Sequence, residues 1–102
     1  MVNLYPQRND EAEKIRPCVI LSDSDVNEIL DLVTIIPCTA NLLGEGLFRI
    51  LLPKRKGLDK DCEVMVEQIR GVSKMRLIET TSSVGLNEMK KIELGVKALL
   101  SL

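Results

Sequence analysis

The chain has 102 residues, enough for one folded domain with a core, yet small enough that dimerisation would bury additional apolar surface. Its 14 basic and 15 acidic residues nearly cancel, so any site for a polyanion must be a local patch. Histidine is absent, which excludes histidine triads, paired-histidine ribonuclease chemistry and histidine metal sites.

Three widely spaced cysteines, Cys18, Cys38 and Cys62, lie in apolar runs and form neither a disulfide framework nor a zinc motif. We interpret them as buried thiols. No apolar stretch approaches the roughly 20 residues of a membrane span. We therefore expect a soluble cytoplasmic protein, a single domain over residues 1–102, with no metal and no cofactor.

The N-terminal segment predicts the end of a strand at residues 2–6, either stunted or with its start upstream of this chain. Residues 7–14 contain five charged side chains and predict a solvated loop. The first clear strand is predicted over residues 15–21. Pro17 has no amide proton, which favours a place at the strand opening, so Arg16 should lie at the rim of the sheet. Without other information, a surface ion pair to Glu11 or Glu13 is the favoured interpretation of Arg16, because structural ion pairs are common.

Several possible N-caps at residues 22–25 predict a short helical turn, and residues 32–39 predict a second buried strand, rich in β-branched side chains. The connection of about ten residues is short for a parallel crossover and suits an antiparallel pair. Antiparallel pairing would bring Arg16 and Thr39 to the same edge of the sheet.

A turn at residues 41–46 precedes a third predicted strand over residues 47–52. The basic loop that follows carries Lys54, Arg55 and Lys56. Such loops are commonly just solvated, but this one offers contacts for phosphate groups.

Residues 62–70 alternate clearly and predict one continuous strand with Gln68 and Arg70 on one face if no bulge intervenes. These two side chains suit hydrogen bonds to a base edge and a phosphate. Another strand is predicted over residues 76–84. A terminal helix should follow, with Asn87 as N-cap, and Gly95 should permit a close approach to the sheet or to a partner helix. The order of elements predicts a mainly β, α+β fold with a terminal helix.

Together, the ordered motifs resemble the MazF/PemK family of toxin endoribonucleases. The motifs are Leu4-x-Pro6, Arg16-Pro17, Pro37-Cys38-Thr39, Leu51-Leu52-Pro53, Gln68-Ile69-Arg70 and Arg76-Leu77-Ile78 before the terminal helix. The resemblance implies an SH3-like barrel and a homodimer that cleaves single-stranded RNA without a metal. It also implies a type II toxin-antitoxin system, in which a cognate antitoxin holds the toxin inactive.

The family's arginine before proline corresponds to Arg16, its catalytic threonine or serine to Thr39, and its loop glutamate to Glu11. The resemblance thus implies cleavage through the ribose 2′-hydroxyl to a cyclic phosphate. Arg16 would stabilise charge, Thr39 would orient the phosphate or the 2′-hydroxyl, and Glu11 would be the base. The chain departs from the family pattern around the loop glutamate, where the usual glycines are missing, and in the first strand.

Two other functions stay open at this point. The same fold serves toxins that poison DNA gyrase by binding, and a member with a truncated first strand would persist as a non-catalytic dimer that sequesters antitoxin. The pair Arg16 and Thr39 favours the ribonuclease.

Overall fold

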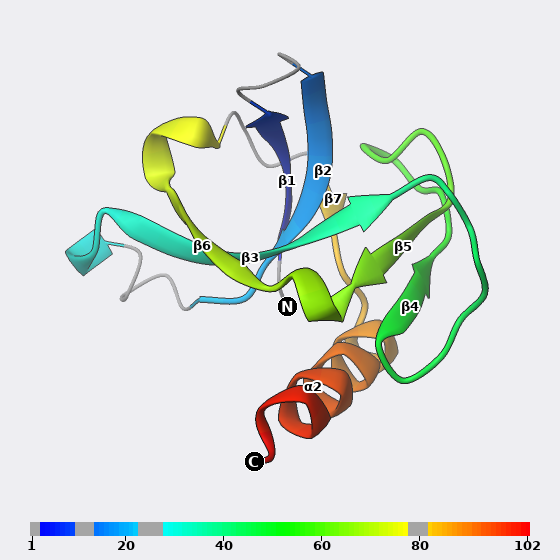
Figure 1. Ribbon diagram of the computed structural model, residues 1–102. Helices are drawn as coiled ribbons and strands as arrows, with labels where there is room; N and C mark the ends of the chain where they lie inside the picture. Colours follow the sequence, from blue (N-terminus) through cyan, green and yellow to red (C-terminus); the bar gives the residue numbers. More distant parts are fainter. Residues whose placement is uncertain (1–2, 10–13, 23–27, 78–81) are drawn as a thin grey trace.

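The protein is a strongly bent β-sheet with one long helix packed against it (Figure 1). The computed structural model describes residues 3–9, 14–22, 28–77 and 82–102. Its strands are β1 (Asn3–Asn9), β2 (Lys14–Ile20), β3 (Leu32–Thr39), β4 (Arg49–Leu52), β5 (Cys62–Met65), β6 (Arg70–Ser73) and β7 (Ser82–Ser83). The 3₁₀ turns η1 (Val66–Gln68) and η2 (Lys74–Arg76) and the helix α2 (Leu86–Leu100) complete the set. The predicted mainly β fold with a terminal helix is confirmed.

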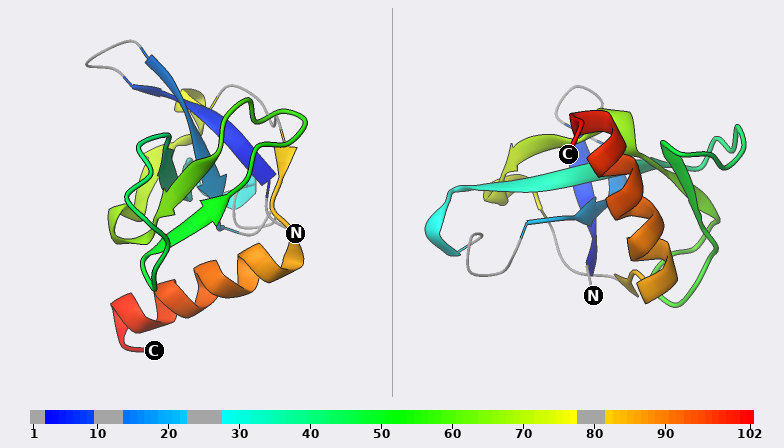
Figure 2. Two further views of the ribbon diagram at one scale, coloured as in Figure 1. Left: turned by 90° about the vertical axis from the view of Figure 1, so that its right-hand side faces the viewer. Right: turned by 90° about the horizontal axis from the view of Figure 1, so that it is seen from below.

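Strand order places β3 at the centre of the molecule. The sheet runs β4-β5-β3-β2-β1-β7, with β6 also paired to β3. This order does not return to β4, so the described strands form a curved, barrel-like sheet that stays open. Figure 2 shows α2 lying across one side of this sheet.

The hairpin of β1 and β2 corrects the prediction for the N-terminal region. β1 has seven residues and pairs with β2 at six positions, so the first strand is not stunted, and residues 7–9 and 14 belong to strands rather than to a loop. Pro17 lies inside β2, opposite Pro6, and not at the strand opening. Since neither proline has an amide proton, this pair forms no ladder hydrogen bonds, and both prolines are tolerated inside a hairpin.

The strand predicted over residues 62–70 is in fact divided in two by η1. β5 and β6 both run antiparallel to β3, and the pairing register along β3 shifts by three residues between them, which is the length of η1. The prediction of one continuous strand is therefore wrong. Val66 is buried within the 3₁₀ turn, so the apolar alternation continues through a segment that is not extended.

Two apolar clusters lie on opposite faces of the sheet. A helix-side core is formed by Val19, Ile36, Cys38, Ile50, Leu52, Leu58, Cys62, Val64, Val66, Val84 and Ile92. A smaller second core is formed by Cys18, Ile20, Val33, Ile35 and Val72. Neighbouring residues of β2, such as Cys18 and Val19, thus point to different faces, as alternation along a strand requires. All three cysteines are buried thiols that form no disulfide, as predicted.

The helix α2 begins two residues earlier than its predicted cap implied. Gly85 is the N-cap, and its N–H donates to the Glu88 carboxylate at 2.9 Å, whereas Asn87 lies inside the first turn. Ile92 and Gly95 are the buried positions. A Cβ at Gly95 would lie 2.5 Å from the carbonyl oxygen of Leu47, which confirms the predicted close approach.

Other predicted boundaries shift by a few residues. The third strand begins at Arg49, because Leu47 and Phe48 form a turn. Of the strand predicted over residues 76–84, Ser82–Ser83 form β7 and Leu77 is extended, while Lys74–Arg76 form η2 and residues 78–81 lie outside the described part. The helical turn predicted after Ser22 also falls largely outside it, although Glu28 and Ile29 are helical. Within the described residues, no helix is long and apolar enough to cross a membrane.

Candidate functional site

Arg16 and Thr39 lie on the same face of the sheet, at the polar end of the β2–β3 pair. The two strands are antiparallel, as predicted, with Cys18 opposite Pro37 and Ile20 opposite Ile35. The paired ladder ends at Cys18 and Pro37, two positions short of Arg16 and of Thr39. Alternation along β2 puts Arg16 on the same face as Cys18 and Ile20, and alternation along β3 puts Thr39 on the same face as Val33 and Ile35, which is the face of the second core. Arg16 is exposed and Thr39 is half-buried.

Arg70 belongs to the same face of the sheet but lies further along it. It pairs with Ile35 of β3, and it lies two positions before Val72 on β6. Arg70 therefore shares a face with both of these second-core residues. Gln68 ends η1 and is exposed. Gln68 therefore lies in a 3₁₀ turn and not on one strand with Arg70, as was predicted. The β3 residue paired with Arg70 is Ile35, which lies four positions, about 13 Å, from Thr39 along the strand.

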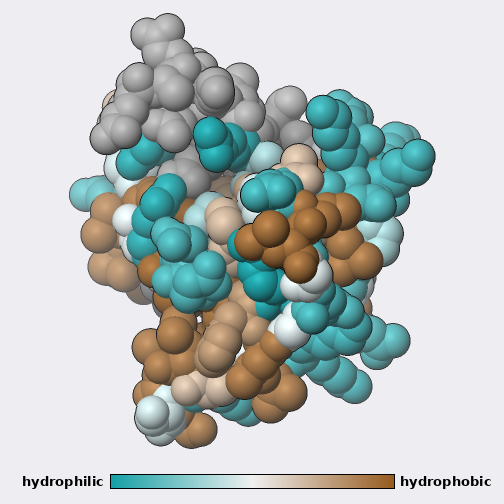
Figure 3. Space-filling model, turned by 45° about the vertical axis from the view of Figure 1, so that its right-hand side comes forward, coloured by the Kyte–Doolittle hydropathy of each residue, from teal (hydrophilic) through white to brown (hydrophobic). Residues whose placement is uncertain are grey.

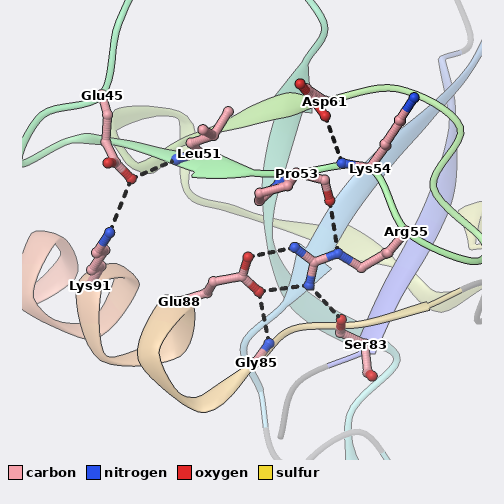
Figure 4. Close-up of polar contacts among 10 residues, drawn as sticks. All are labelled: Glu45, Leu51, Pro53, Lys54, Arg55, Asp61, Ser83, Gly85, Glu88 and Lys91. Atoms are coloured by element: carbon pink, nitrogen blue, oxygen red, sulfur yellow. Dashed lines mark hydrogen bonds and ion pairs between the residues drawn. The ribbon is translucent and has the colours of Figure 1, made fainter.

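The basic loop divides into two kinds of residue. Lys54 and Lys56 are exposed. Arg55 instead points toward α2, where its Nη1 donates to Glu88 Oε1 at 2.6 Å and its Nη2 to Glu88 Oε2 at 2.5 Å (Figure 4). Further hydrogen bonds to the carbonyls of Pro53 and Ser83 complete its surroundings. Arg55 thus holds the loop against the helix, and its predicted contact with RNA stays a prediction.

A buried carboxylate that the sequence did not reveal lies beside Thr39. Glu63 of β5 is directly opposite Thr39 and only 2% exposed. Its Oε1 accepts hydrogen bonds from the N–H of Leu43 at 2.9 Å and from Arg49 Nε at 3.1 Å, and its Oε2 accepts from the N–H of Gly44 at 3.0 Å. Arg49 Nη2 lies 3.0 Å from Oε1 and also donates to the carbonyl of Asn41 at 2.9 Å.

These contacts keep the Glu63 side chain ionised. The hydrogen bond from the Leu43 amide, then that of Arg49, lower the pKa of Glu63 against the opposing effect of burial. Gly44 makes the geometry possible, because its φ of 120° lets two successive amides point at one carboxylate. A carboxylate with this pattern of donors is a poor proton acceptor.

Sequence reasoning missed Glu63 and Arg49 because each lies in a strand at a position that alternation assigns to solvent. The only available signal was the pairing of an acidic and a basic side chain on predicted neighbouring strands. Glu11, the predicted base, lies outside the described residues. Among the residues that the structure describes, no group of three or more Cys, Asp or Glu side chains could hold a metal ion.

Residues 1–100 match the model of one protein family, described as PemK-like, MazF-like toxin of type II toxin-antitoxin system. The chain belongs to this family. It is also 31% identical to Endoribonuclease MazF9 of Mycobacterium tuberculosis, over 99% of this chain and 91% of that protein. The predicted family is therefore confirmed.

Solved structures share the fold of this family member. The M. tuberculosis toxin MazF-mt6 superposes with a TM-score of 0.84 at 18% identity, covering 98% of this chain and 97% of that one. MazF in a MazE-MazF complex from Deinococcus radiodurans gives 0.80 at 20% identity, covering 97% and 92%. An endoribonuclease in complex with its cognate antitoxin, from a mycobacterial species, gives 0.79 at 17% identity, covering 98% and 93%. The curved sheet with a terminal helix is thus the MazF toxin fold.

Proposed function

We propose that this protein is the toxin of a type II toxin-antitoxin system and an endoribonuclease that cleaves single-stranded RNA at short sequences without a metal ion. The observation that carries the proposal is the β2–β3 register, which puts Arg16 and Thr39 on one face and at one end of an antiparallel pair. Family membership supplies the reaction class for these two residues.

The proposed reaction uses the ribose 2′-hydroxyl as the nucleophile. As the 2′-oxygen bonds to phosphorus, the bond from phosphorus to the 5′-oxygen breaks, giving a 2′,3′-cyclic phosphate and a free 5′-hydroxyl. Arg16, which is always protonated, stabilises the charge that develops on the phosphate oxygens. Thr39 orients the phosphate or the 2′-hydroxyl by hydrogen bonding, and Glu11 takes the proton of the 2′-hydroxyl.

Lys54, Lys56, Gln68 and Arg70 are the proposed RNA contacts outside the reacting centre. The two lysines would position the backbone, while Gln68 and Arg70 would reach a base edge and a phosphate. Tyr5 and Phe48 are the only aromatic residues of the chain, so recognition relies on hydrogen bonds more than on stacking. Arg55 stays a proposed contact with the RNA backbone as well, made from a guanidinium that Glu88 already holds.

The proposed partners are a second copy of the chain, a cognate antitoxin and RNA, in the cytoplasm. Antitoxin complexes of two proteins with this fold support an antitoxin partner here. The alternative of a silent binding module rested on a truncated first strand, and the seven residues of β1 remove that argument. No feature of the described residues favours a gyrase poison over the ribonuclease.

Cleavage of RNA in the presence of EDTA tests this function. The purified protein, incubated with a long RNA of mixed sequence, should cut at a short recurring motif and leave cyclic phosphate and 5′-hydroxyl ends. Intact RNA, or cleavage that EDTA abolishes, would contradict the proposal.

A further inference from the structure

The Thr39 hydroxyl is connected to Glu63 by a chain of hydrogen bonds through the backbone of Asn41 and the side chain of Arg49. The N–H of Asn41 donates to Thr39 Oγ1 at 3.1 Å, and the carbonyl of Asn41 accepts from Arg49 Nη2 at 2.9 Å. Arg49 is in turn bound to Glu63, which also holds the amides of Leu43 and Gly44. Residues 41–45 have no regular secondary structure, so this network fixes the backbone that leaves β3 at Thr39.

The hydrogen bond from the Asn41 amide limits the further hydrogen bonds that the Thr39 hydroxyl can form. A threonine hydroxyl has one donor and two acceptor positions, and the Asn41 amide occupies one acceptor position. The hydroxyl proton must then point away from the Asn41 amide. On this half-buried side chain, which shares a face with Arg16, that direction suits donation to an anionic oxygen.

We propose that Glu63 and Arg49 are positioning residues of the site: by fixing Asn41 they hold the Thr39 hydroxyl as a hydrogen-bond donor to the scissile phosphate. This inference rests on the proposed function, since it assigns Thr39 to RNA cleavage. Glu63 itself takes no proton, because its oxygens are already bound by amides and by Arg49.

The chain contains its own matched control for a merely structural ion pair. Among the described residues, Glu88 and Arg55 also form a partly buried carboxylate–arginine pair, but this pair joins the loop after β4 to α2 and its hydrogen bonds do not involve Thr39 or Asn41. Glu88→Gln and Glu63→Gln therefore remove the same charge from similar pairs, and only the second should affect the Thr39 hydroxyl.

A double-mutant cycle tests the proposal, using single-turnover cleavage at saturating enzyme of a long single-stranded RNA in EDTA. Glu63→Gln should lower the rate about 10-fold to 100-fold, since small misplacements of a reacting group have effects of this order. In a Thr39→Val background it should cause no further loss, because the hydroxyl that it positions is gone. Glu88→Gln should cleave within about twofold of wild type.

Two outcomes would overturn the proposal. One is a folded Glu63→Gln variant that cleaves at the wild-type rate. The other is an equal fold loss in the wild-type and Thr39→Val backgrounds, which would mean that Glu63 does not act through the hydroxyl. Should Glu63→Gln fail to fold, Arg49→Lys enters the same cycle with the same expectation, because lysine cannot reach Glu63 and the Asn41 carbonyl together.

Hydrogen exchange of the Asn41 amide separates failure of this inference from failure of the proposed function. The amide should be protected in the wild type and exchange at least about tenfold faster in Glu63→Gln and in Thr39→Val, but not in Glu88→Gln. This readout needs no cleavage. Unchanged protection in Glu63→Gln would refute the positioning role even in a fully active enzyme, whereas an inactive wild type with the expected exchange pattern would refute only the ribonuclease.

Discussion

Glu63 and Glu88 are both paired with an arginine, but they stabilise different parts of the protein. Each carboxylate is bound by an arginine and by backbone amides, and each therefore stays ionised. Glu63 organises the segment beside Thr39, whereas Glu88 caps α2 and anchors the loop of Arg55. A third and more exposed ion pair joins Lys91 to Glu45, whose carboxylate also accepts from the Leu51 amide (Figure 4).

The Glu88 pair makes stability depend on pH in a defined direction. Arg55, with the Gly85 amide, lowers the pKa of Glu88. Its contribution to the free energy of unfolding is therefore complete above the unfolded pKa of about 4.3 and is lost as pH falls through the lower folded value. Glu88→Gln should lower the free energy of unfolding at pH 7 by about 1–3 kcal/mol. Its deficit should shrink below about pH 4, as measured by urea denaturation across pH.

A deficit that stays constant from pH 7 to pH 3 would contradict the assigned ionisation. The comparison is made between the variant and the wild type at each pH, because Glu63 also has a lowered pKa and destabilises both proteins in acid.

At the level of residues, sequence reasoning reached Arg16 and Thr39 but not their surroundings. A proline after Arg16 and a strand ending at Thr39 are local signals, and antiparallel pairing follows from the short connection. The partners of Glu63 come from residues 41–49, so its burial depends on a loop conformation that the sequence does not display. The contact of Arg55 with Glu88 was missed for the same reason. The local sequence predicts a solvated loop at Arg55, and its contact with Glu88 forms only when α2 packs against this loop.

At the level of elements, the strands with continuous β-branched runs were predictable and the interrupted ones were not. β3 is buried along most of its length, and its composition predicts a strand directly. η1 contains no glycine or proline to mark a break, and Val66 keeps the apolar period, so nothing local distinguishes it from an extended segment. The second half of β1, residues 7–9, was missed for the opposite reason, since these polar residues are extended only through pairing with β2.

The packing of α2 on the sheet depends on the absence of a side chain at Gly95. Alanine is the better helix former by about 1 kcal/mol. A Cβ at this position would nevertheless meet the Leu47 carbonyl oxygen at 2.5 Å and Val66 at 3.3 Å. Gly95→Ala should therefore lower the free energy of unfolding by about 1–3 kcal/mol net, because the helix must move away from the turn. Chemical denaturation measures this change.

Gly46→Ala is the control for this substitution, since a Cβ there has nothing within 4 Å. It should change stability by less than about 0.5 kcal/mol. If Gly95→Ala proved as stable as the wild type or more so, the close approach of α2 would be refuted.

At the scale of the whole molecule, the apolar surface left by the fold predicts association. Leu94 is 61% exposed and Leu100 is 53% exposed on α2, and Leu43 is 73% exposed on the neighbouring loop. Figure 3 shows hydrophobic surface gathered at the lower part of the molecule, where α2 lies, while much of the right-hand side is hydrophilic. Exposed apolar surface of this kind is typical of an interface.

Sedimentation at micromolar concentration should therefore report a homodimer. Burial of apolar side chains drives the association, so the dimer should persist in high salt, which screens only the charged contacts. A monomer at all accessible concentrations would contradict this prediction and would remove a second copy from the proposed partners.

The central claim is that Arg16 stabilises the charge on a phosphate during metal-independent RNA cleavage. Its most direct test is single-turnover cleavage at saturating enzyme in EDTA, where defects in binding no longer affect the rate. Arg16→Ala should cut about 10²–10³ times more slowly than the wild type while keeping the fold. Arg16→Lys should not restore the rate, since lysine lacks the planar fork that grips two oxygens. Cleavage by Arg16→Ala at the wild-type rate would contradict the account and leave Arg16 as a surface arginine at the end of β2.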